Sequence, residues 1–172
     1  RYDTSYIQGV GLGSITDALS SIKRHVYDKG TLTLAEMVEA LDADFVGHES
    51  LRQLFLNKTP KFGNDDDDAD SIMRRVFEAY YRAIDGRPNS RGGRYAIDLL
   101  PTTCHVYFGS VTGALPDGRK AGYPLSEGIS PVQGADRRGP TAVIRSVAKM
   151  DHARTGGTLL NQKFSPQLLA TD

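Results

Sequence analysis

The sequence predicts a mixed α/β fold that contains more helix than strand. Apolar residues recur at helical spacing in several segments, whereas stretches with strand character are few and lie far apart. Strands joined by long helical segments pair in parallel, because an antiparallel hairpin needs only a short turn between its strands. We therefore expect a parallel sheet with helical crossovers.

The first extended segment, residues 6–10, leads through a glycine-rich passage into a helix. Ser14 or Thr16 is expected to cap this helix, and Gly30 to end it. The residues that predict its buried face recur at helical spacing: Ile15, Leu19, Ile22 and Val26.

Thr33 and Glu36 have the spacing of a capping box, which predicts that a second helix starts after Thr33. Its expected apolar stripe is Leu34, Met37, Val38 and Leu41. A short third helix is predicted around residues 49–56, and Pro and Gly predict a loop at 58–64.

The acidic run at residues 65–68, with Asp70, precedes a strong helical pattern that extends to Ile84. Carboxylates at a helix N-terminus interact favourably with the helix dipole. A calcium site is the alternative, but the run lacks the glycine and the distal glutamate of an EF-hand loop. The start of a helix is therefore favoured.

The second half begins with a polar turn at residues 85–93. Two extended segments are predicted next, at 95–100 and at 102–109, because the latter contains β-branched and aromatic residues. Residues 109–140 are rich in Gly and Pro and show almost no periodicity, which is typical of functional irregular segments.

A last helix is predicted to start at Pro140, since proline suits the first helical position, and to reach Met150. Gly156 and Gly157 are expected to break the chain, and residues 158–164 to form a strand.

Composition excludes several functional classes. The 172 residues carry 21 basic and 21 acidic side chains, so the chain lacks the positive surplus of a nucleic-acid or membrane-surface protein. No apolar run approaches the ~20 residues that span a bilayer. With one cysteine, no internal disulfide can form, which favours the cytoplasm. Both ends interrupt apolar segments, so we expect a fragment of a larger domain.

The residues alone predict no convincing active site. The four histidines are isolated and lack metal-ligand spacing; His25 and His48 are interpreted as surface or locally hydrogen-bonded residues. Cys104 and His105 are neighbours on a predicted strand, where their side chains would diverge, so a small buried cysteine is favoured over thiol catalysis. The glycines at positions 9, 11 and 13 lack the spacing of a dinucleotide fingerprint. The 117–120 turn and the 139–141 segment are weak candidates for anion binding.

The irregular segment carries a resemblance that covers nearly the whole chain. Residues 112–122 read TGALPDGRKAG, residues 124–136 read PLSEGISPVQGAD, and residues 156–164 read GGTLLNQKF, while residues 61–67 upstream read KFGNDDD. These segments resemble the glycyl radical enzymes of the pyruvate formate-lyase-like family.

The resemblance implies part of a ten-stranded α/β barrel, built from two parallel five-stranded halves and wrapped by helices. Residues 1–172 would supply a helix-rich part of its second half-barrel. The family's cysteine loop would lie upstream of Arg1 and its glycyl radical domain downstream of Asp172, so the fragment alone would be inactive. Cys104 does not match the cysteine loop.

The family's chemistry implies an anaerobic, cytoplasmic lyase. A glycyl radical is installed by an activating enzyme that uses S-adenosylmethionine and an iron–sulfur cluster; it passes to a cysteine, whose thiyl abstracts hydrogen from a small-molecule substrate. No cofactor, metal, nucleic acid or membrane is expected to bind this chain. The full-length protein is expected to be a homodimer.

Residues 6–13 and 99–109 most resemble the trans-4-hydroxy-L-proline dehydratase subgroup of the family, with the glycerol and propanediol dehydratases next. In the family, the strand expected at 102–108 runs past the substrate. On a strand, Thr103, His105 and Tyr107 would share one face, and Thr102 would share the other with Cys104 and Val106. The substrate-binding candidates are therefore Thr102, Thr103, His105 and Tyr107.

A threonine is expected to contact the substrate, Thr103 ahead of Thr102; the alternative is that both serve only strand formation. The general acid or base would lie on the cysteine loop, so no catalytic residue is assigned within this chain. Other substrates of the family, including glycerol, diols, choline and pyruvate, remain alternatives. A non-catalytic paralogue or binding fragment is the alternative from another class, and the flanking gene sequence would distinguish it.

Overall fold

The computed structural model describes residues 5–164 and Pro166. Its strands form a parallel sheet in the order β1-β2-β3, which confirms the predicted pairing. The strands are β1 (Ser5–Gln8), β2 (Tyr95–Leu99) and β3 (Thr155–Thr158). Ser5 lies opposite Tyr95 and Gln8 opposite Asp98, so β1 and β2 pair in regular register.

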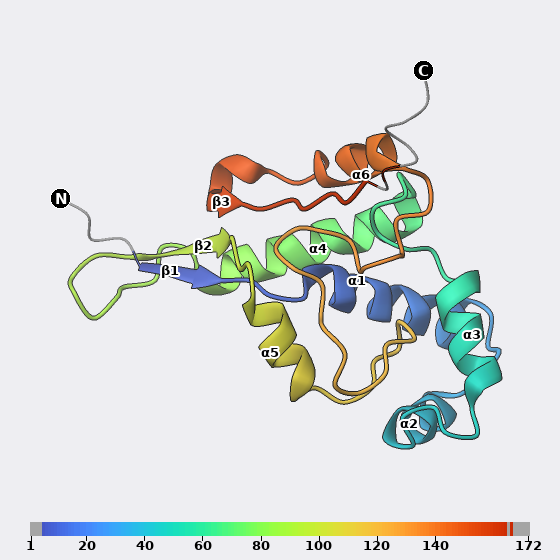
Figure 1. Cartoon of the computed structure of the whole chain (residues 1–172). Coiled ribbons are helices and arrows are strands. Elements are labelled where there is room, and N and C mark those ends of the chain that lie inside the picture. Colours follow the sequence, from blue (N-terminus) through green and yellow to red (C-terminus); the bar gives the residue numbers. More distant parts are fainter. Residues whose placement is uncertain (1–4, 165, 167–172) are drawn as a thin grey trace.

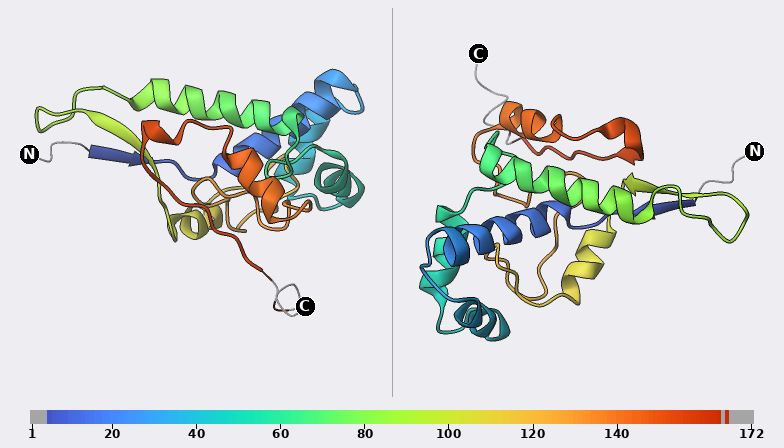
Figure 2. Two further views of the ribbon diagram at one scale, coloured as in Figure 1. Left: turned by 90° about the horizontal axis from the view of Figure 1, so that it is seen from above. Right: turned by 180° about the vertical axis from the view of Figure 1, so that it is seen from behind.

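Helices occupy most of the chain between the strands. They are α1 (Leu12–Ser21), continued by a π-helix (Ile22–Asp28), then α2 (Leu34–Asp42), α3 (Glu49–Lys58), α4 (Asp67–Ile84), α5 (Cys104–Ser110) and α6 (Pro140–Val147). A 3-10 turn (His152–Arg154) precedes β3. Figure 1 and Figure 2 show α1 and α4 side by side, with α2 and α3 gathered at one end of the molecule.

Two apolar clusters form the interior. The larger joins the sheet to α1, α4, α6 and the irregular segment through Leu12, Phe62, Met73, Phe77, Ile97, Leu99, Ile129, Val143, Val147 and Met150. The smaller holds α2 and α3 together through Met37, Ala40, Phe45 and Phe55. Ile97 and Leu99 of β2 are fully buried, so the central strand anchors the larger cluster.

Three helix starts follow their local sequence signals. Thr33 Oγ1 accepts a hydrogen bond from Glu36 N, and Glu36 Oε2 accepts one from Thr33 N, which confirms the capping box. Asp66 caps α4 by accepting a hydrogen bond from Asp68 N, which confirms that the acidic run starts a helix. Pro140 occupies the first turn of α6, as predicted.

The start of α1 differs from the prediction. The helix begins at Leu12, and Gly11 takes the N-cap position with a positive φ of 81°. Ser14 and Thr16 lie inside the helix: Thr16 Oγ1 donates to Leu12 O at 2.7 Å, and Ser14 Oγ accepts from Ser126 N at 2.9 Å. Both hydroxyls are buried and serve contacts within the fold instead of the cap. Gly30 follows the π-helix with φ 58°, as expected of a helix stop.

Residues 102–109 are not a strand. Cys104–Ser110 form α5, in which His105 and Gly109 are buried and the residues between them are exposed, a spacing of four that fits a helix. Gly109 packs directly on the backbone of residues 123–125, where a Cβ would lie 2.3 Å from Tyr123 O. Packing against a distant segment therefore overrides the β-propensity of the local sequence.

β3 and α6 have other bounds than the sequence predicts. β3 starts at Thr155 and ends at Thr158, so Gly156 and Gly157 lie inside the strand and residues 159–164 lie outside it. A Cβ on Gly156 would lie 2.1 Å from the Tyr6 ring, so this strand position has no room for a side chain. α6 ends at Val147, before Met150.

Two predicted buried faces are partly exposed. In α2, Leu34 and Val38 are each nearly half exposed, whereas Met37 is buried. In α1, Ile15 and Leu19 are also exposed to solvent in this chain.

Candidate functional site

The carboxyl end of β2 carries the predicted substrate-binding residues. Thr102 and Thr103 lie between Leu99 and α5, and both side chains are exposed. Within residues 5–164, neither hydroxyl has a hydrogen-bond partner. Ligands of α/β folds bind outside the carboxyl ends of parallel strands. Two hydroxyls at this edge can therefore bind polar groups of a ligand.

The helix changes how the four predicted residues are arranged. Because residues 104–110 are helical, the alternation expected for a strand is wrong: His105 is buried at 6% exposure, whereas Tyr107 is 67% exposed. Cys104, expected to be buried, is exposed. The structure thus keeps Thr102 and Thr103 together, turns His105 inward and directs Tyr107 away from it; a substrate-binding role for these residues stays a prediction.

His105 faces an acidic partner from the irregular segment. Its Nδ1 lies 3.7 Å from Glu127 Oε2, and its backbone carbonyl accepts a hydrogen bond from Leu125 N. The other carboxylate oxygen of Glu127 accepts a hydrogen bond from Asn161 Nδ2 at 2.7 Å. The carboxylate therefore joins the start of α5 to the segment that follows β3.

The loop at residues 127–130 is held against the ends of two strands. Gly128 has φ 48°, and a Cβ at this position would lie 2.5 Å from Leu159 O and 2.9 Å from Leu99 O. Ile129 N donates to Leu159 O, and Leu159 N donates to Leu99 O. Only glycine combines this backbone conformation with so close an approach.

The buried Arg119 side chain connects several parts of the irregular segment at residues 109–140. Its guanidinium donates to backbone carbonyls that lie on both sides of it in the sequence: Gly109, Thr112, Gly113, Tyr123 and Pro124. Asp117 Oδ1 in turn accepts a hydrogen bond from Arg119 N at 2.8 Å. The turn that sequence analysis treated as a weak anion site is therefore occupied by contacts within the fold.

A buried charged cluster lies beneath this turn. Lys61 Nζ donates to Asp117 O at 2.9 Å and lies 3.9 Å from Asp17 Oδ2. Burial raises the pKa of Asp17 to about 7, although the Lys61 ammonium and a hydrogen bond from Phe62 N oppose the rise. Burial also raises the pKa of Asp117. The cluster connects α1 to the loop before α4 and to the Asp117 turn.

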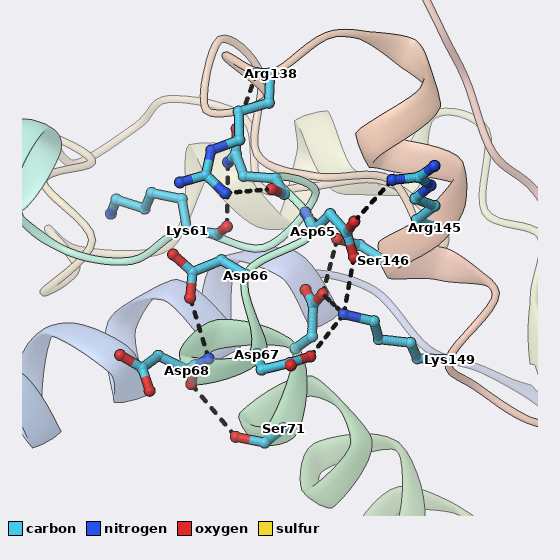
Figure 3. A network of polar contacts seen from close by, with 12 residues as sticks. Lys61, Asp65, Asp66, Asp67, Asp68, Ser71, Arg138, Arg145, Ser146 and Lys149 are labelled. Carbon is cyan, nitrogen blue, oxygen red and sulfur yellow. Dashed lines mark hydrogen bonds and ion pairs between the residues drawn. The ribbon is translucent and has the colours of Figure 1, made fainter.

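A second polar network joins the start of α4 to the end of α6 (Figure 3). Lys149 Nζ lies 2.7 Å from Asp70 Oδ2, 2.8 Å from Asp67 Oδ1 and 3.1 Å from Asp65 Oδ1. Burial disfavours the charge of Lys149, but the hydrogen bonds that its ammonium donates to the three carboxylates outweigh this effect and raise its pKa. Ser146 Oγ also donates to Asp70 Oδ2. The acidic run thus binds a lysine, and the described residues contain no cluster of side chains that could hold a metal ion.

The sequence predicts the threonines as substrate contacts, which stays a prediction, and it gives no indication of the contacts that Glu127 and Asn161 make beside them. No local spacing links these residues to His105, because they lie 22 and 56 positions further along the chain. His25, interpreted as a surface or locally bonded residue, is buried and its Nε2 contacts Thr59 Oγ1 at 2.9 Å. Among the described residues, no helix is both long and apolar enough to cross a bilayer.

Two family models match the chain. The pyruvate formate lyase-like model matches residues 1–109, and the glycine radical model matches residues 125–172. The Lys149 network therefore bridges the two matched regions, as does the contact between His105 and Glu127.

Relatives with known activity resemble the chain over nearly its full length. Trans-4-hydroxy-L-proline dehydratase of Clostridioides difficile is 57% identical over 98% of this chain and 21% of the relative. The crystal structure of that organism's hydroxyproline dehydratase, with trans-4-hydroxy-L-proline bound, matches with a TM-score of 0.96 and 56% identity over 100% of this chain and 22% of that one.

The glycerol-bound B12-independent glycerol dehydratase of Clostridium butyricum matches with a TM-score of 0.93 and 44% identity, over 100% of this chain and 22% of that one. The chain thus spans about a fifth of the length of these relatives. Its parallel strands and helices form part of the α/β barrel of the glycyl radical enzymes. The chain belongs to the pyruvate formate lyase-like family.

Proposed function

We propose that the full-length parent of this chain is a glycyl radical dehydratase that removes water from trans-4-hydroxy-L-proline. The observation that carries the proposal is the likeness to the C. difficile dehydratase across the whole chain, at 57% identity and a TM-score of 0.96. Glycerol or a diol is the second candidate substrate, supported by the 44% identity to the glycerol-bound enzyme.

In this proposal the radical chemistry comes from a cysteine loop and a radical glycine that lie outside residues 1–172. The residues of this chain bind and orient the substrate, with Thr103 ahead of Thr102 as the hydroxyl that contacts it. An S-adenosylmethionine-dependent iron–sulfur enzyme installs the radical, and the parent acts as a cytoplasmic homodimer. Removing a hydroxyl group needs a proton donor, which we also place on the cysteine loop.

The test is made on the full-length parent, expressed without oxygen and activated by its partner enzyme. Mass spectrometry should detect a dehydrated pyrroline product after trans-4-hydroxy-L-proline is added, and electron paramagnetic resonance should detect a glycyl radical. A radical with product from glycerol or a diol alone would show that the substrate is wrong. A parent that forms no radical with a competent activating enzyme would contradict the dehydratase proposal itself.

The role of Thr103 is tested by a matched pair of variants in the same assay. Thr103→Val removes the hydroxyl at nearly constant volume, and we expect kcat/KM to fall about tenfold, the effect of about one hydrogen bond. Thr103→Ser keeps the hydroxyl, and its kcat/KM should stay within about threefold of the value for the unsubstituted full-length protein. Equal effects of both variants would show that the threonine contributes only through its shape.

A further inference from the structure

We propose that Glu127 is a positioning residue for substrate binding, which holds His105 and through it the Thr102–Thr103 segment. The inference rests on the proposed function, because it takes these threonines as the substrate contacts. The side chain of Glu127 is 18% exposed and lies beside His105, so in this proposal it acts through His105 and is not a catalytic residue.

The geometry around Glu127 supports this role. Its two carboxylate oxygens face different segments: Oε2 lies 3.7 Å from His105 Nδ1, and Oε1 accepts a hydrogen bond from Asn161 Nδ2. The backbone of Glu127 is fixed as well, because its carbonyl accepts a hydrogen bond from Ser130 N. Ser130 Oγ then accepts one from Asn161 N, which closes the connection behind the carboxylate.

His105 needs such a partner. Its Nδ1 is buried and has no hydrogen-bond partner among the described residues. A buried polar group without a partner is costly, and a carboxylate is the strongest acceptor that an imidazole N–H can find. The Glu127 carboxylate is the acidic group beside this nitrogen, 3.7 Å away, and it is the acceptor that the fold places within reach of Nδ1.

The position of His105 determines that of Thr103. Thr103 occupies the N-cap position of α5, and its carbonyl accepts a hydrogen bond from Val106 N. The helix has only seven residues, so it contributes little stability of its own and depends on its anchors. At its start the anchors are the His105 side chain against Glu127 and the His105 carbonyl, which binds Leu125 N.

The first test compares Glu127→Gln, His105→Asn and the double variant in the activated full-length parent, with the exposed Glu39→Gln as the matched control. We expect each single variant to raise KM by about fivefold to tenfold while kcat and the radical content stay within about twofold. Because the residues act as a pair, the double variant should raise KM no further than the single variant with the higher KM does.

A KM for Glu127→Gln within about twofold of the Glu39→Gln value would overturn the proposal, and so would single effects that multiply in the double variant. A fall in kcat at constant KM would also contradict it, since a misplaced binding segment must weaken binding.

A second test does not depend on the substrate. In hydrogen exchange of the full-length parent, the peptide that covers residues 102–110 should exchange about fivefold faster in Glu127→Gln than in Glu39→Gln, because α5 loses its anchor. Unchanged exchange would contradict the positioning role. Faster exchange in a parent that makes no product would support positioning and show that the proposed function has failed.

Discussion

The helices α4 and α5 are held in place in different ways. α4 has 18 residues, an N-cap at Asp66, carboxylates in its first turn and a continuous apolar face. α5 has seven residues and neither a side-chain cap nor a first-turn carboxylate; its ends are bound by Arg119 and by the Glu127 loop. The start of α4 thus has its signals within a few positions of sequence, to which the distant Lys149 adds an ion pair, whereas α5 has no such local signal and depends on residues 10 or more positions away. This difference explains why the sequence predicts α4 correctly but predicts a strand where the structure has α5.

Arg119→Met should have the largest effect, because it removes the hydrogen bonds that hold the C-terminal end of α5. The carbonyls of residues 109, 113 and 123 would lose the guanidinium. The bond to residue 109 is buried, although this carbonyl keeps a backbone hydrogen bond from Thr112 N, and the other two bonds are partly buried. We expect the free energy of local unfolding of α5 to fall by about 3 kcal/mol or more, measured by hydrogen exchange of residues 104–113 in the full-length parent.

Arg82→Met is the matched control, because Arg82 is 75% exposed and its partner among the described residues is a glutamate one helical turn away. Its exchange should resemble that of the parent. Similar losses in both variants would contradict the view that α5 depends on a distant arginine.

Lys149→Met should cause a smaller loss of local unfolding free energy, and this loss should occur at the start of α4. Without Lys149, the carboxylate of Asp70 keeps, within the described part of the chain, its hydrogen bond from Ser146 alone in a nearly fully buried site. Breaking a fully buried ion pair costs about 3–5 kcal/mol, and because Lys149 is 27% exposed we expect about 2 kcal/mol in the local unfolding of the first turn of α4. Asp67→Asn is the control: its side chain is 94% exposed, and its loss should leave exchange almost unchanged.

The parts that sequence reasoning reached are those with local causes. The capping box at Thr33, the cap at Asp66 and Pro140 each act within one helical turn, so their spacing predicts them. The parallel sheet followed from the separation of its strands. α5 and the contact between His105 and Glu127 could not be predicted in this way, because they depend on tertiary approach between segments 22 positions apart. The resemblance supplied the family, and local reasoning alone supplied no site.

The buried cluster beneath the Arg119 turn should make stability depend on pH. Burial raises the pKa of Asp17 from 3.8 to about 7, so between these values the folded state binds more protons than the unfolded state. The contribution of Asp17 to the free energy of unfolding therefore falls as pH rises from about 4 to about 7. Asp17→Asn keeps an acceptor for Phe62 N without this proton.

The measurement is the apparent melting temperature of the parent and the variant at several pH values. We expect the melting temperature of the parent to fall relative to that of Asp17→Asn as pH rises from about 5 to about 7. Above pH 7 the difference between the two melting temperatures should become constant. A difference that grows as pH falls would mean that Lys61 lowers the pKa of Asp17 more strongly than burial raises it.

Thr33→Ala should have the smallest effect, and it isolates the local kind of control. The capping box of α2 makes its hydrogen bonds within four residues, on an exposed surface. We expect hydrogen exchange of the first turn of α2 to become about fivefold faster, while α5 is unaffected. Thr33→Ser, which keeps the hydroxyl, should exchange like the parent. If Thr33→Ala also loosened α5, the two helices would be coupled through the Asp44 carboxylate, which accepts a hydrogen bond from Ala121 N, and the division between local and distant control would fail.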